Sequence, residues 1–322
     1  MNITDYAKVK LLNLQRRYYI KKFNSLIKNT VDFELDESEI LTVSILCHHN
    51  AVNMALAMLK SLYRFLEVKF PIEIHDDGSL TPQDNERFKR SFKNIKIIKR
   101  SDADKQIMSY LEENKLNEVI KFRKKHNVNM QFTDLSFFCN TKYCLQIDTD
   151  ILFFNKPYFL QTDFLEKIVA DPRTPTLYNI DRGPAYSYYD EDMERVMGKK
   201  MPFQFNAGLV LYPVDKTLHH FAENILKMRL PMHKPYTETQ TIQCMQLLSI
   251  GECIPLDETV DVVFRTLEMN PVYTYSDYSK ITCEHYCAWA RNLYYLDFIE
   301  KIYPYIKRNT TFQSYYYKKI QG

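Results

Sequence analysis

Apolar and polar positions alternate along the chain in blocks that predict short buried strands separated by helices. Ile40 to Cys47 is a β-branched apolar run, which predicts a buried strand. Residues 53–65 then carry apolar side chains at three- and four-residue spacing, which predicts a helix. Further predicted strands are 71–75, 95–99, 143–147 and 203–212, the last interrupted at 206–208, and further predicted helices begin at Pro82 and cover 104–125, 219–228 and 238–248. This order predicts an α/β fold with a mostly parallel central sheet flanked by helices.

Polar clusters follow three of the predicted strands. They are His48-His49-Asn50, the segment 75–79 that contains Asp76-Asp77-Gly78-Ser79, and Asp148-Thr149-Asp150. In parallel α/β sheets, ligands bind outside the carboxyl ends of the strands. We therefore expect the three clusters to line one ligand site.

The pattern divides the chain into a helical start, a catalytic domain and a tail. Residues 6–29 predict a basic amphipathic helix within the first 36 residues. Such a helix binds anionic membrane surfaces, and a helix packed on the domain with a solvated basic face also explains the pattern. We predict a catalytic domain at 37–300, with a nucleotide-binding half over about 40–155 and a sugar or acceptor half over about 156–300, and a basic, tyrosine-rich tail at 301–322.

Composition narrows the class of protein. The net charge of +3 on 322 residues gives no indication of a nucleic-acid partner. Seven irregularly spaced cysteines favour a reducing compartment over a disulfide framework. Because there is no run of 18 apolar residues, we expect a soluble, cytoplasmic enzyme, for which the basic helix offers peripheral attachment to the membrane. The 24 tyrosines and 20 phenylalanines suit stacking on sugars or bases, although a compositional bias explains them as well.

Asp148-Thr149-Asp150 is the segment with the clearest chemistry. Two carboxylates one residue apart, just past a strand end, can hold one divalent cation directly or through water, and hard oxygen ligands suit Mg²⁺ or Mn²⁺. Such a metal neutralises charge on a leaving diphosphate. The alternatives are a pair of acidic caps at a strand-to-loop junction and a haloacid-dehalogenase-like phosphatase, in which the first Asp is the nucleophile. That phosphatase motif usually lies near the start of its domain and continues with Gly, whereas Ile151-Leu152 follows here.

Residues 40 to about 155 resemble the GT-A glycosyltransferases, which have a Rossmann-like nucleotide-binding sheet and a metal-binding Asp-x-Asp. Residues 42–46 with His48 and Asn50 resemble the first strand and nucleotide-contacting loop of that fold, and Asp76-Asp77-Gly78-Ser79 resembles the DDGS segment of family 2 members. The resemblance implies that His48, Asn50, Asp76 and Asp77 bind the nucleotide. It also implies that Asp148 and Thr149 contact the donor while Asp148 and Asp150 hold the metal.

The second half most resembles the retaining family 8 transferases. Phe205-Asn206-Ala207-Gly208 resembles their FNAG strand, Glu238-Thr239-Gln240 lies where they have an acidic segment facing the donor sugar, and Cys283-Glu284-His285-Tyr286 resembles their late His-Tyr. The resemblance implies that Asn206, Ala207 and Gly208 line the sugar pocket, that Glu238 and Gln240 are catalytic, and that His285 is the third metal ligand. A lone histidine is also often structural.

Two departures from family 8 leave the stereochemistry open. Trp289-Ala290-Arg291-Asn292 follows where that family has Lys-Pro-Trp, so Arg291 would supply the positive charge near the diphosphate, and position 131 is Gln where the family tends to carry Arg. Glu238 would be the general base of an inverting enzyme. In a retaining enzyme, Glu238 or Gln240 would stabilise the sugar cation.

The predicted function is therefore transfer of a sugar from a nucleotide-diphosphate donor, foremost a UDP-sugar, to a saccharide, lipid-linked glycan or protein acceptor. The competing functions are the phosphatase and a catalytically inactive GT-A carbohydrate-binding domain.

Overall fold

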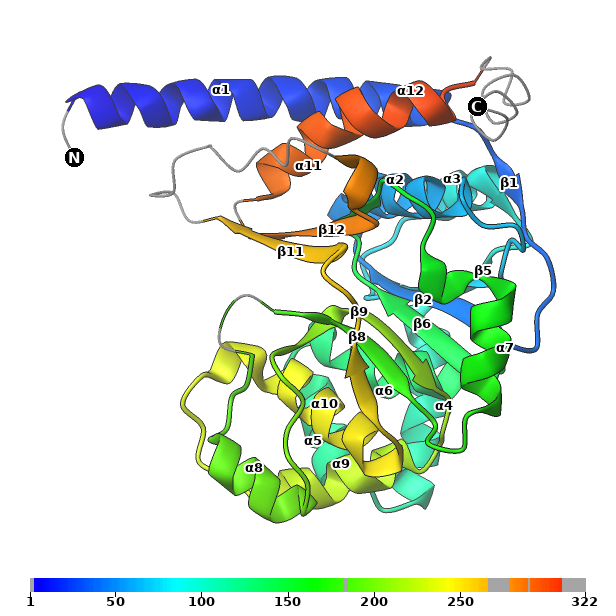
Figure 1. Cartoon of the computed structure of the whole chain (residues 1–322), viewed down its shortest axis with the longest axis vertical. Coiled ribbons are helices and arrows are strands. Elements are labelled where there is room, and N and C mark those ends of the chain that lie inside the picture. Colours follow the sequence, from blue (N-terminus) through cyan, green and yellow to red (C-terminus); the bar gives the residue numbers. More distant parts are fainter. Residues whose placement is uncertain (1–2, 182, 184, 266–277, 289, 309–322) are drawn as a thin grey trace.

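The computed structural model describes residues 3–181, 183, 185–265, 278–288 and 290–308. Its main feature is a seven-stranded sheet in the order β10-β8-β9-β6-β2-β3-β5 (Figure 1). Strand β9 runs antiparallel to β6 and β8, and the other neighbours are parallel. The strands are β2 (Leu41–Cys47), β3 (Ile72–Asp76), β5 (Lys96–Ile98), β6 (Tyr143–Ile147), β8 (Thr176–Ile180), β9 (Phe205–Pro213) and β10 (Cys253–Pro255).

Helices cover both faces of this sheet because successive side chains of a strand point to opposite sides. In β6, Tyr143 and Leu145 join the larger core cluster, which includes much of α2, whereas Cys144 joins the cluster on the other face, with α9 and α10. Leu209 and Val210 of β9 divide in the same way. The helices are α2 (Val52–Tyr63), α3 (Pro82–Ser91), α4 (Arg100–Glu113), α5 (Asn117–Lys125), α6 (Met130–Phe138), α7 (Thr162–Ala170), α8 (Asp190–Met197), α9 (Leu218–Lys227) and α10 (Glu238–Ile250).

Two small sheets accompany the large one. The strands β11 (Val260–Arg265), β12 (Cys283–Ala288) and β7 (Ile151–Phe153) form a three-stranded sheet in which β12 is antiparallel to β7. The strands β1 (Phe33–Glu34) and β4 (Phe92–Lys93) form a parallel pair. The three-stranded sheet matters for function because β7 follows Asp148-Thr149-Asp150 directly.

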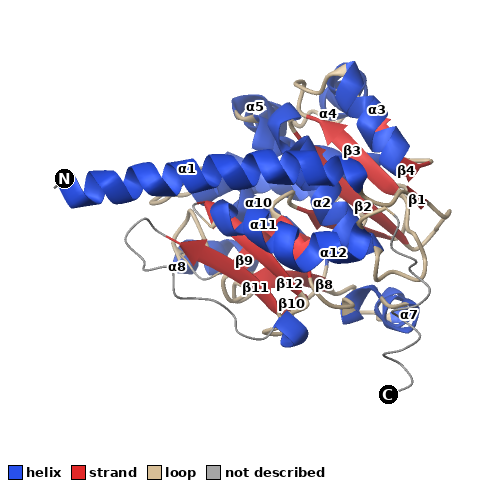
Figure 2. Cartoon of the chain, turned by 90° about the horizontal axis from the view of Figure 1, so that it is seen from above, coloured by secondary structure: helices blue, strands red, loops and turns tan. Residues whose placement is uncertain are grey.

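The N-terminal helix α1 (Ile3–Leu26) lies across α11 (Arg291–Asp297) and α12 (Tyr303–Ile306), as Figures 1 and 2 show. Phe23 anchors it, because this buried ring packs edge-on against Tyr294 and Phe298. Leu14 and Tyr18 are exposed, so apolar side chains lie both on the packed side of α1 and on its solvent side. Among the described residues, no helix has the length and apolar character needed to cross a membrane.

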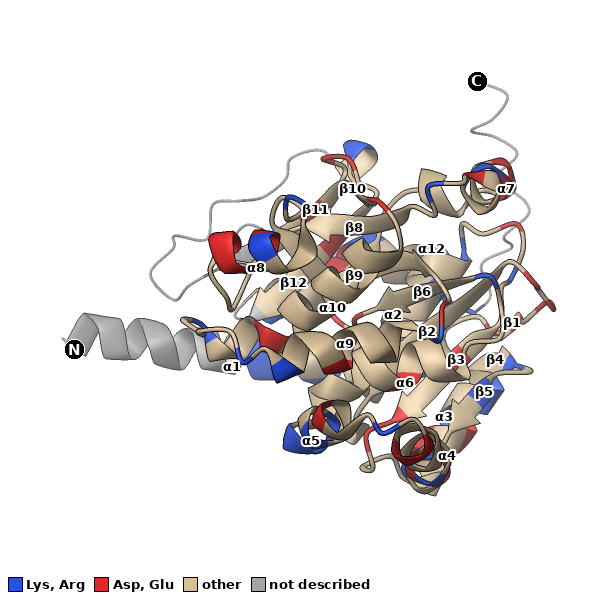
Figure 3. Ribbon diagram, turned by 90° about the horizontal axis from the view of Figure 1, so that it is seen from below, with Lys and Arg blue, Asp and Glu red and all other residues tan. Residues whose placement is uncertain are grey.

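Charges of both signs are mixed over the lower face of the molecule (Figure 3). The first turn of α8 is acidic, and the last turn of α5 is basic.

Some predicted elements differ from the structure. Residues 104–125 form two helices, since Lys115 has a positive φ of 57° and ends the first of them. The strand predicted over 203–212 is not interrupted at Asn206, because β9 continues through Asn206-Ala207-Gly208 and β8 accommodates it with an irregular register. Residues 309–322 of the predicted tail and Trp289 lie outside the described residues.

Candidate functional site

The three polar clusters lie at one edge of the sheet. Strands β6, β2 and β3 are parallel neighbours, and Cys47 pairs with Asp76 at their carboxyl ends. The backbone N–H of His49 donates a hydrogen bond to Ser79 Oγ at 2.9 Å, which joins the first two clusters. The strand order therefore positions 48–50, 76–79 and 148–150 around a common space.

Two antiparallel pairings bring distant residues to Asp148 and Asp150. The N–H of Asp148 donates to the carbonyl of Gly208 at 2.7 Å, where β9 runs beside β6. His285 pairs with Ile151 across β12 and β7, and the N–H of Tyr286 donates to the carbonyl of Asp150 at 2.9 Å. As a result, ligand atoms of Asp148, Asp150 and His285 all lie within 4.8 Å of one another.

The metal-ligand candidates already interact with each other and with two further side chains. His285 Nε2 lies 3.2 Å from Asp150 Oδ1 and 3.7 Å from Asp148 Oδ2. Arg291 Nε donates to Asp150 Oδ2 at 2.8 Å, and Gln131 Nε2 donates to Asp148 Oδ1 at 2.7 Å. The side chains of Asp150 and His285 are 5% and 6% exposed, whereas that of Arg291 is 54% exposed and can follow a ligand.

The two carboxyl groups differ in acidity although they are one residue apart. Burial raises the pKa of Asp148 to about 6, against the effect of nearby His285. Burial also opposes ionisation of Asp150, but His285 and Arg291 outweigh it and lower the pKa of that carboxyl. For His285, burial is outweighed by Cys287 and Asp150, which raise its pKa well above the usual range. The neighbours of Asp150 therefore stabilise its charged form. The neighbours of Asp148 offset less of the cost of burying its charge.

These residues fit a divalent cation. Two carboxylates and one imidazole form a donor set that suits Mn²⁺ or Mg²⁺, with room for substrate oxygens to complete the coordination. Gly208 makes the arrangement compact, because a Cβ at this position would overlap the ring of His285. Only glycine lets the β9 backbone pass this close to the imidazole.

The Asn206-Ala207-Gly208 segment lies beside the metal-ligand candidates and is held by hydrogen bonds. Asn206 Oδ1 accepts from the N–H of Gly208 at 2.8 Å, and its Nδ2 donates to Asp181 Oδ2 at 3.0 Å. Gln240 Oε1 accepts from the N–H of Ala207 at 3.1 Å. The predicted residues Asn206, Ala207, Gly208 and Gln240 are thus brought together.

Glu238 is engaged elsewhere. Its Oε2 is 2.6 Å from Lys125 Nζ, and its Oε1 accepts a hydrogen bond from the hydroxyl of Tyr188 at 3.5 Å. The Glu238 side chain is only 12% exposed. In this conformation an ion pair occupies the carboxylate that the sequence predicts to be catalytic.

Asp76 and Asp77 use part of their carboxylates to shape their own loop. Asp76 Oδ1 accepts from the N–H groups of Gly78 and Leu80, and Asp77 Oδ1 accepts from the N–H and hydroxyl of Ser79. Gly78 has a φ of 102°, which favours glycine. The second oxygen of Asp77, Oδ2, accepts a long hydrogen bond of 3.5 Å from Asn127 Nδ2. His48 and Asn50 are exposed, and Thr149 is partly exposed.

Sequence reasoning missed three side chains that hold the site. Gln131 was recognised only as a departure from family 8, yet it contacts Asp148 directly. Asp181, just after β8, accepts a hydrogen bond from Asn206. The sequence pattern did not predict β8, because this short strand follows a Pro-containing loop. The third is Asp84, whose Oδ2 lies 2.6 Å from His49 Nδ1. Asp84 also forms the capping box of α3 with Thr81. The pattern S/T-x-x-D at 81–84 is the one available signal among these.

Comparison with known proteins gives a fold but no close relative. No family model and no curated protein matches the sequence. The bifunctional glycosyltransferase WbbM superposes with a TM-score of 0.50 at 14% identity, covering 88% of this chain and 52% of WbbM. This chain therefore spans about half the length of that protein. The chain has the GT-A fold. The predicted fold class, an α/β fold with a mostly parallel central sheet, is confirmed.

Two further solved structures superpose with slightly lower TM-scores. The galactosyltransferase LgtC, solved with donor and acceptor sugar analogues, has a TM-score of 0.49 at 12% identity, covering 84% of this chain and 98% of LgtC. The glycosyltransferase GlyE of Streptococcus pneumoniae has a TM-score of 0.49 at 10% identity, covering 87% of this chain and 64% of GlyE. In this GT-A domain, the site assembled above lies at the carboxyl ends of the parallel strands, where α/β sheets bind ligands.

Proposed function

We propose that this chain is a metal-dependent glycosyltransferase that uses a nucleotide-diphosphate sugar. The observation that carries the proposal is the convergence of Asp148 and Asp150, from the connection between β6 and β7, with His285 of β12. Their ligand atoms lie within 4.8 Å of one another and against Gly208 of β9. The GT-A fold supports it, because WbbM, which shares the fold, is a glycosyltransferase.

Asp148, Asp150 and His285 would hold Mn²⁺ or Mg²⁺. When bound, such an ion neutralises charge on the diphosphate of the donor as the sugar leaves. Arg291 contributes a second positive charge from a half-exposed position beside Asp150. Gln131 orients Asp148 by its hydrogen bond and excludes water from one carboxylate oxygen. Among the described residues, His285 and Arg291 are the charged side chains paired with the two carboxylates.

The donor would lie across the edge of the sheet. Asp76, Asp77 and the exposed His48 and Asn50 would bind the nucleoside. A carboxylate suits the N–H of a uracil or the hydroxyls of a ribose. We therefore propose a UDP-sugar as the donor. Asn206 and the backbone at 207–208 would face the sugar, as the resemblance to family 8 implies.

Gln240 is better placed than Glu238 to act on the sugar. Hydrogen bonds hold the Gln240 amide beside the sugar-facing segment, since its Oε1 accepts from the N–H of Ala207 and its Nε2 donates to the carbonyl of Ala185. Glu238 is paired with Lys125. This favours the family-8-like arrangement, in which an amide stabilises the sugar cation and the configuration is retained. An inverting reaction needs the Lys125–Glu238 pair to open first, so that Glu238 can take the acceptor proton.

The acceptor would be a saccharide, a lipid-linked glycan or a protein. Exposed Leu14 and Tyr18 on α1, with exposed Arg17 and Lys21 beside them, provide apolar and basic groups for an anionic membrane on the cytoplasmic side. We propose that α1 brings the enzyme to a membrane that carries a lipid-linked acceptor.

The test is nucleoside diphosphate release from a panel of nucleotide sugars with Mn²⁺, comparing the wild-type protein with Asp150→Ala. The transferase proposal expects metal-dependent release from at least one donor and at least about a hundredfold loss in the variant, since a metal ligand and its charge are removed. The control is Asp163→Ala, which removes an exposed carboxylate of α7.

The same assay separates the alternatives. Cleavage of simple phosphomonoesters in place of nucleotide sugars would indicate the phosphatase. Donor binding without any turnover would indicate an inactive carbohydrate-binding domain.

A further inference from the structure

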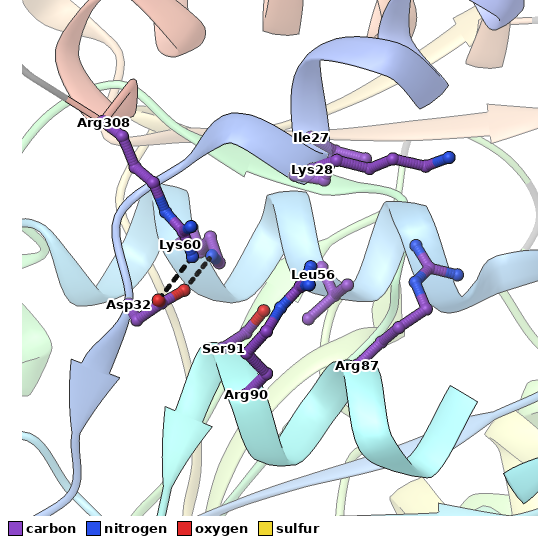
Figure 4. A pocket seen from close by; sticks show the side chains of 9 residues that line it. All are labelled: Ile27, Lys28, Asp32, Leu56, Lys60, Arg87, Arg90, Ser91 and Arg308. Atoms are coloured by element: carbon purple, nitrogen blue, oxygen red, sulfur yellow. Dashed lines mark hydrogen bonds and ion pairs between the residues drawn. The ribbon is translucent and has the colours of Figure 1, made fainter. Parts of the chain in front are cut away.

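A basic pocket lies apart from the metal-ligand candidates, between the end of α1, helices α2 and α3, and the segment at residue 308 (Figure 4). Its enclosed space is small, about 10 Å³, and rises to about 250 Å³ when the open mouth is included. Five cationic side chains line it together with a single carboxylate. They are Lys28, Lys60, Arg87, Arg90 and Arg308, with Asp32.

Lys60 forms the floor of the basic pocket. Its side chain is 2% exposed, and its Nζ donates to the carbonyl of Val31 at 2.6 Å and lies 3.5 Å from Asp32 Oδ1. Arg308 reaches the same carboxylate, with a guanidinium nitrogen 2.6 Å from Asp32 Oδ2. Asp32 is therefore paired with two cations, and one of them, Lys60, is buried.

The other three cations have little compensation. Arg87 and Arg90 extend from α3 toward α2 (Figure 4), and Arg87 is 3.7 Å from Asp84, a carboxylate already engaged by Thr81 and His49. Within the described ranges, no carboxylate lies at ion-pair distance from Lys28 or Arg90. Five positive charges thus share one lining carboxylate in a concave, partly buried space, where like charges repel each other strongly.

The titration of Lys60 agrees with this shortage of negative charge. Burial lowers the pKa of Lys60 to about 8, Asp32 opposes this effect, and Arg308 and Arg90 add to it. An anion in the pocket would relieve the repulsion and raise the pKa of Lys60.

We propose that the basic pocket is a phosphate-binding site, distinct from the site for the donor. Three guanidinium groups provide forked donors that match phosphate oxygens, and Lys60 and Lys28 add point charges. Because the enclosed space is small, the phosphate would lie at the mouth of the pocket, and any attached moiety would lie outside it. A bound phosphate would also tie together the end of α1, α2, α3 and the segment at 308, which come from distant parts of the sequence.

The phosphate is either free or part of a larger molecule such as an anionic lipid, and the test separates these sources. Isothermal titration of the full chain with inorganic phosphate, at pH 7 and constant ionic strength in KCl, should reveal one site. We expect Arg90→Gln and Arg87→Gln each to weaken binding roughly tenfold, because each removes a charge-assisted donor. The matched control is Lys89→Gln, which removes the same charge from α3 at an exposed residue paired with Glu86.

A second arm uses vesicles of phosphatidylglycerol against vesicles of phosphatidylcholine. Loss of phosphatidylglycerol binding in Arg90→Gln, but not in Lys89→Gln, assigns the site to a lipid phosphate. Binding of inorganic phosphate alone, with the same dependence on Arg90, assigns it to a free phosphate. The proposal is overturned if neither probe binds, or if Lys89→Gln weakens binding as much as Arg90→Gln. Arg87 also donates a hydrogen bond to Asn53, so Arg87→Gln can disturb the fold. If that variant does not fold, the result for Arg90→Gln decides the test.

Discussion

Asp148 and Asp150 show how two neighbouring carboxylates can have opposite effects on stability. The charged form of Asp150 is stabilised by His285 and Arg291, which lower its pKa. The charged form of Asp148 is disfavoured by burial, and its pKa rises from 3.8 to about 6. Because the folded pKa of Asp148 lies above the unfolded value, its contribution to stability falls as the pH rises from about 4 to 6 and stays unfavourable above 6.

We therefore predict that Asp148→Asn stabilises the protein at pH 7 in the presence of a chelator. The shift corresponds to about 3 kcal/mol at full burial, and we expect about half of this because the side chain is 31% exposed. Asp150→Asn should instead destabilise the protein by about 1–3 kcal/mol, since it breaks a buried charged network. Thermal unfolding at pH 4 and pH 7 measures both effects. Equal destabilisation by both variants would contradict the prediction.

Arg291 gives a second prediction at the residue scale. Its guanidinium lies 2.8 Å from Asp150 and competes there with any cation. Arg291→Gln should therefore bind Mn²⁺ several-fold more tightly in the absence of nucleotide and bind the nucleotide sugar more weakly. Titration calorimetry with each ligand measures the two affinities, and Arg291→Lys is the control that keeps the charge. A variant in which both affinities move in the same direction would refute this role for Arg291.

Among the elements, β9 and β12 depend on each other through Gly208. We predict that Gly208→Ala destabilises the protein by about 1–3 kcal/mol and abolishes Mn²⁺ binding, because the added methyl group overlaps the His285 ring. Gly183→Ala is the control, since a Cβ there meets its nearest neighbour at an ordinary 3.6 Å.

A double variant distinguishes a specific overlap from general damage to the sheet. Removing the ring in Gly208→Ala/His285→Ala should recover part of the lost stability without recovering Mn²⁺ binding. Additive losses in unfolding experiments would mean that the two residues are not coupled.

The strands of the two sheets show which elements a sequence pattern can predict. The apolar runs predicted β2, β3 and β6 closely, because a buried parallel strand is a local and nearly continuous signal. The five-residue β8 gave no such signal, and with it Asp181 was missed. That His285 is a neighbour of Asp150 depends on the register between β7 and β12, which no local pattern contains. The resemblance to family 8 predicted His285 as a ligand, and the structure shows it beside Asp150.

At the scale of the whole molecule, α1 packs on the GT-A domain through Phe23. The exposed Leu14 and Tyr18 remain the basis for predicting membrane attachment. Leu14→Glu together with Tyr18→Glu should reduce co-sedimentation with anionic vesicles about tenfold, because it replaces apolar groups by negative charges. Tyr236→Glu, at another exposed aromatic residue, is the control. Unchanged co-sedimentation would rule out α1 as the attachment element.

The pairing of β12 with β7 has a consequence for how the protein is made. A nascent chain that has emerged as far as residue 160 already contains both carboxylates, but its imidazole is supplied more than a hundred residues later. Until β12 docks, the segment after Asp150 lacks its partner strand, so the cluster of Asp148, Asp150 and His285 cannot form during early synthesis. If the cluster binds a metal, binding would occur only after folding is complete. The cation would then stabilise only chains that have already folded.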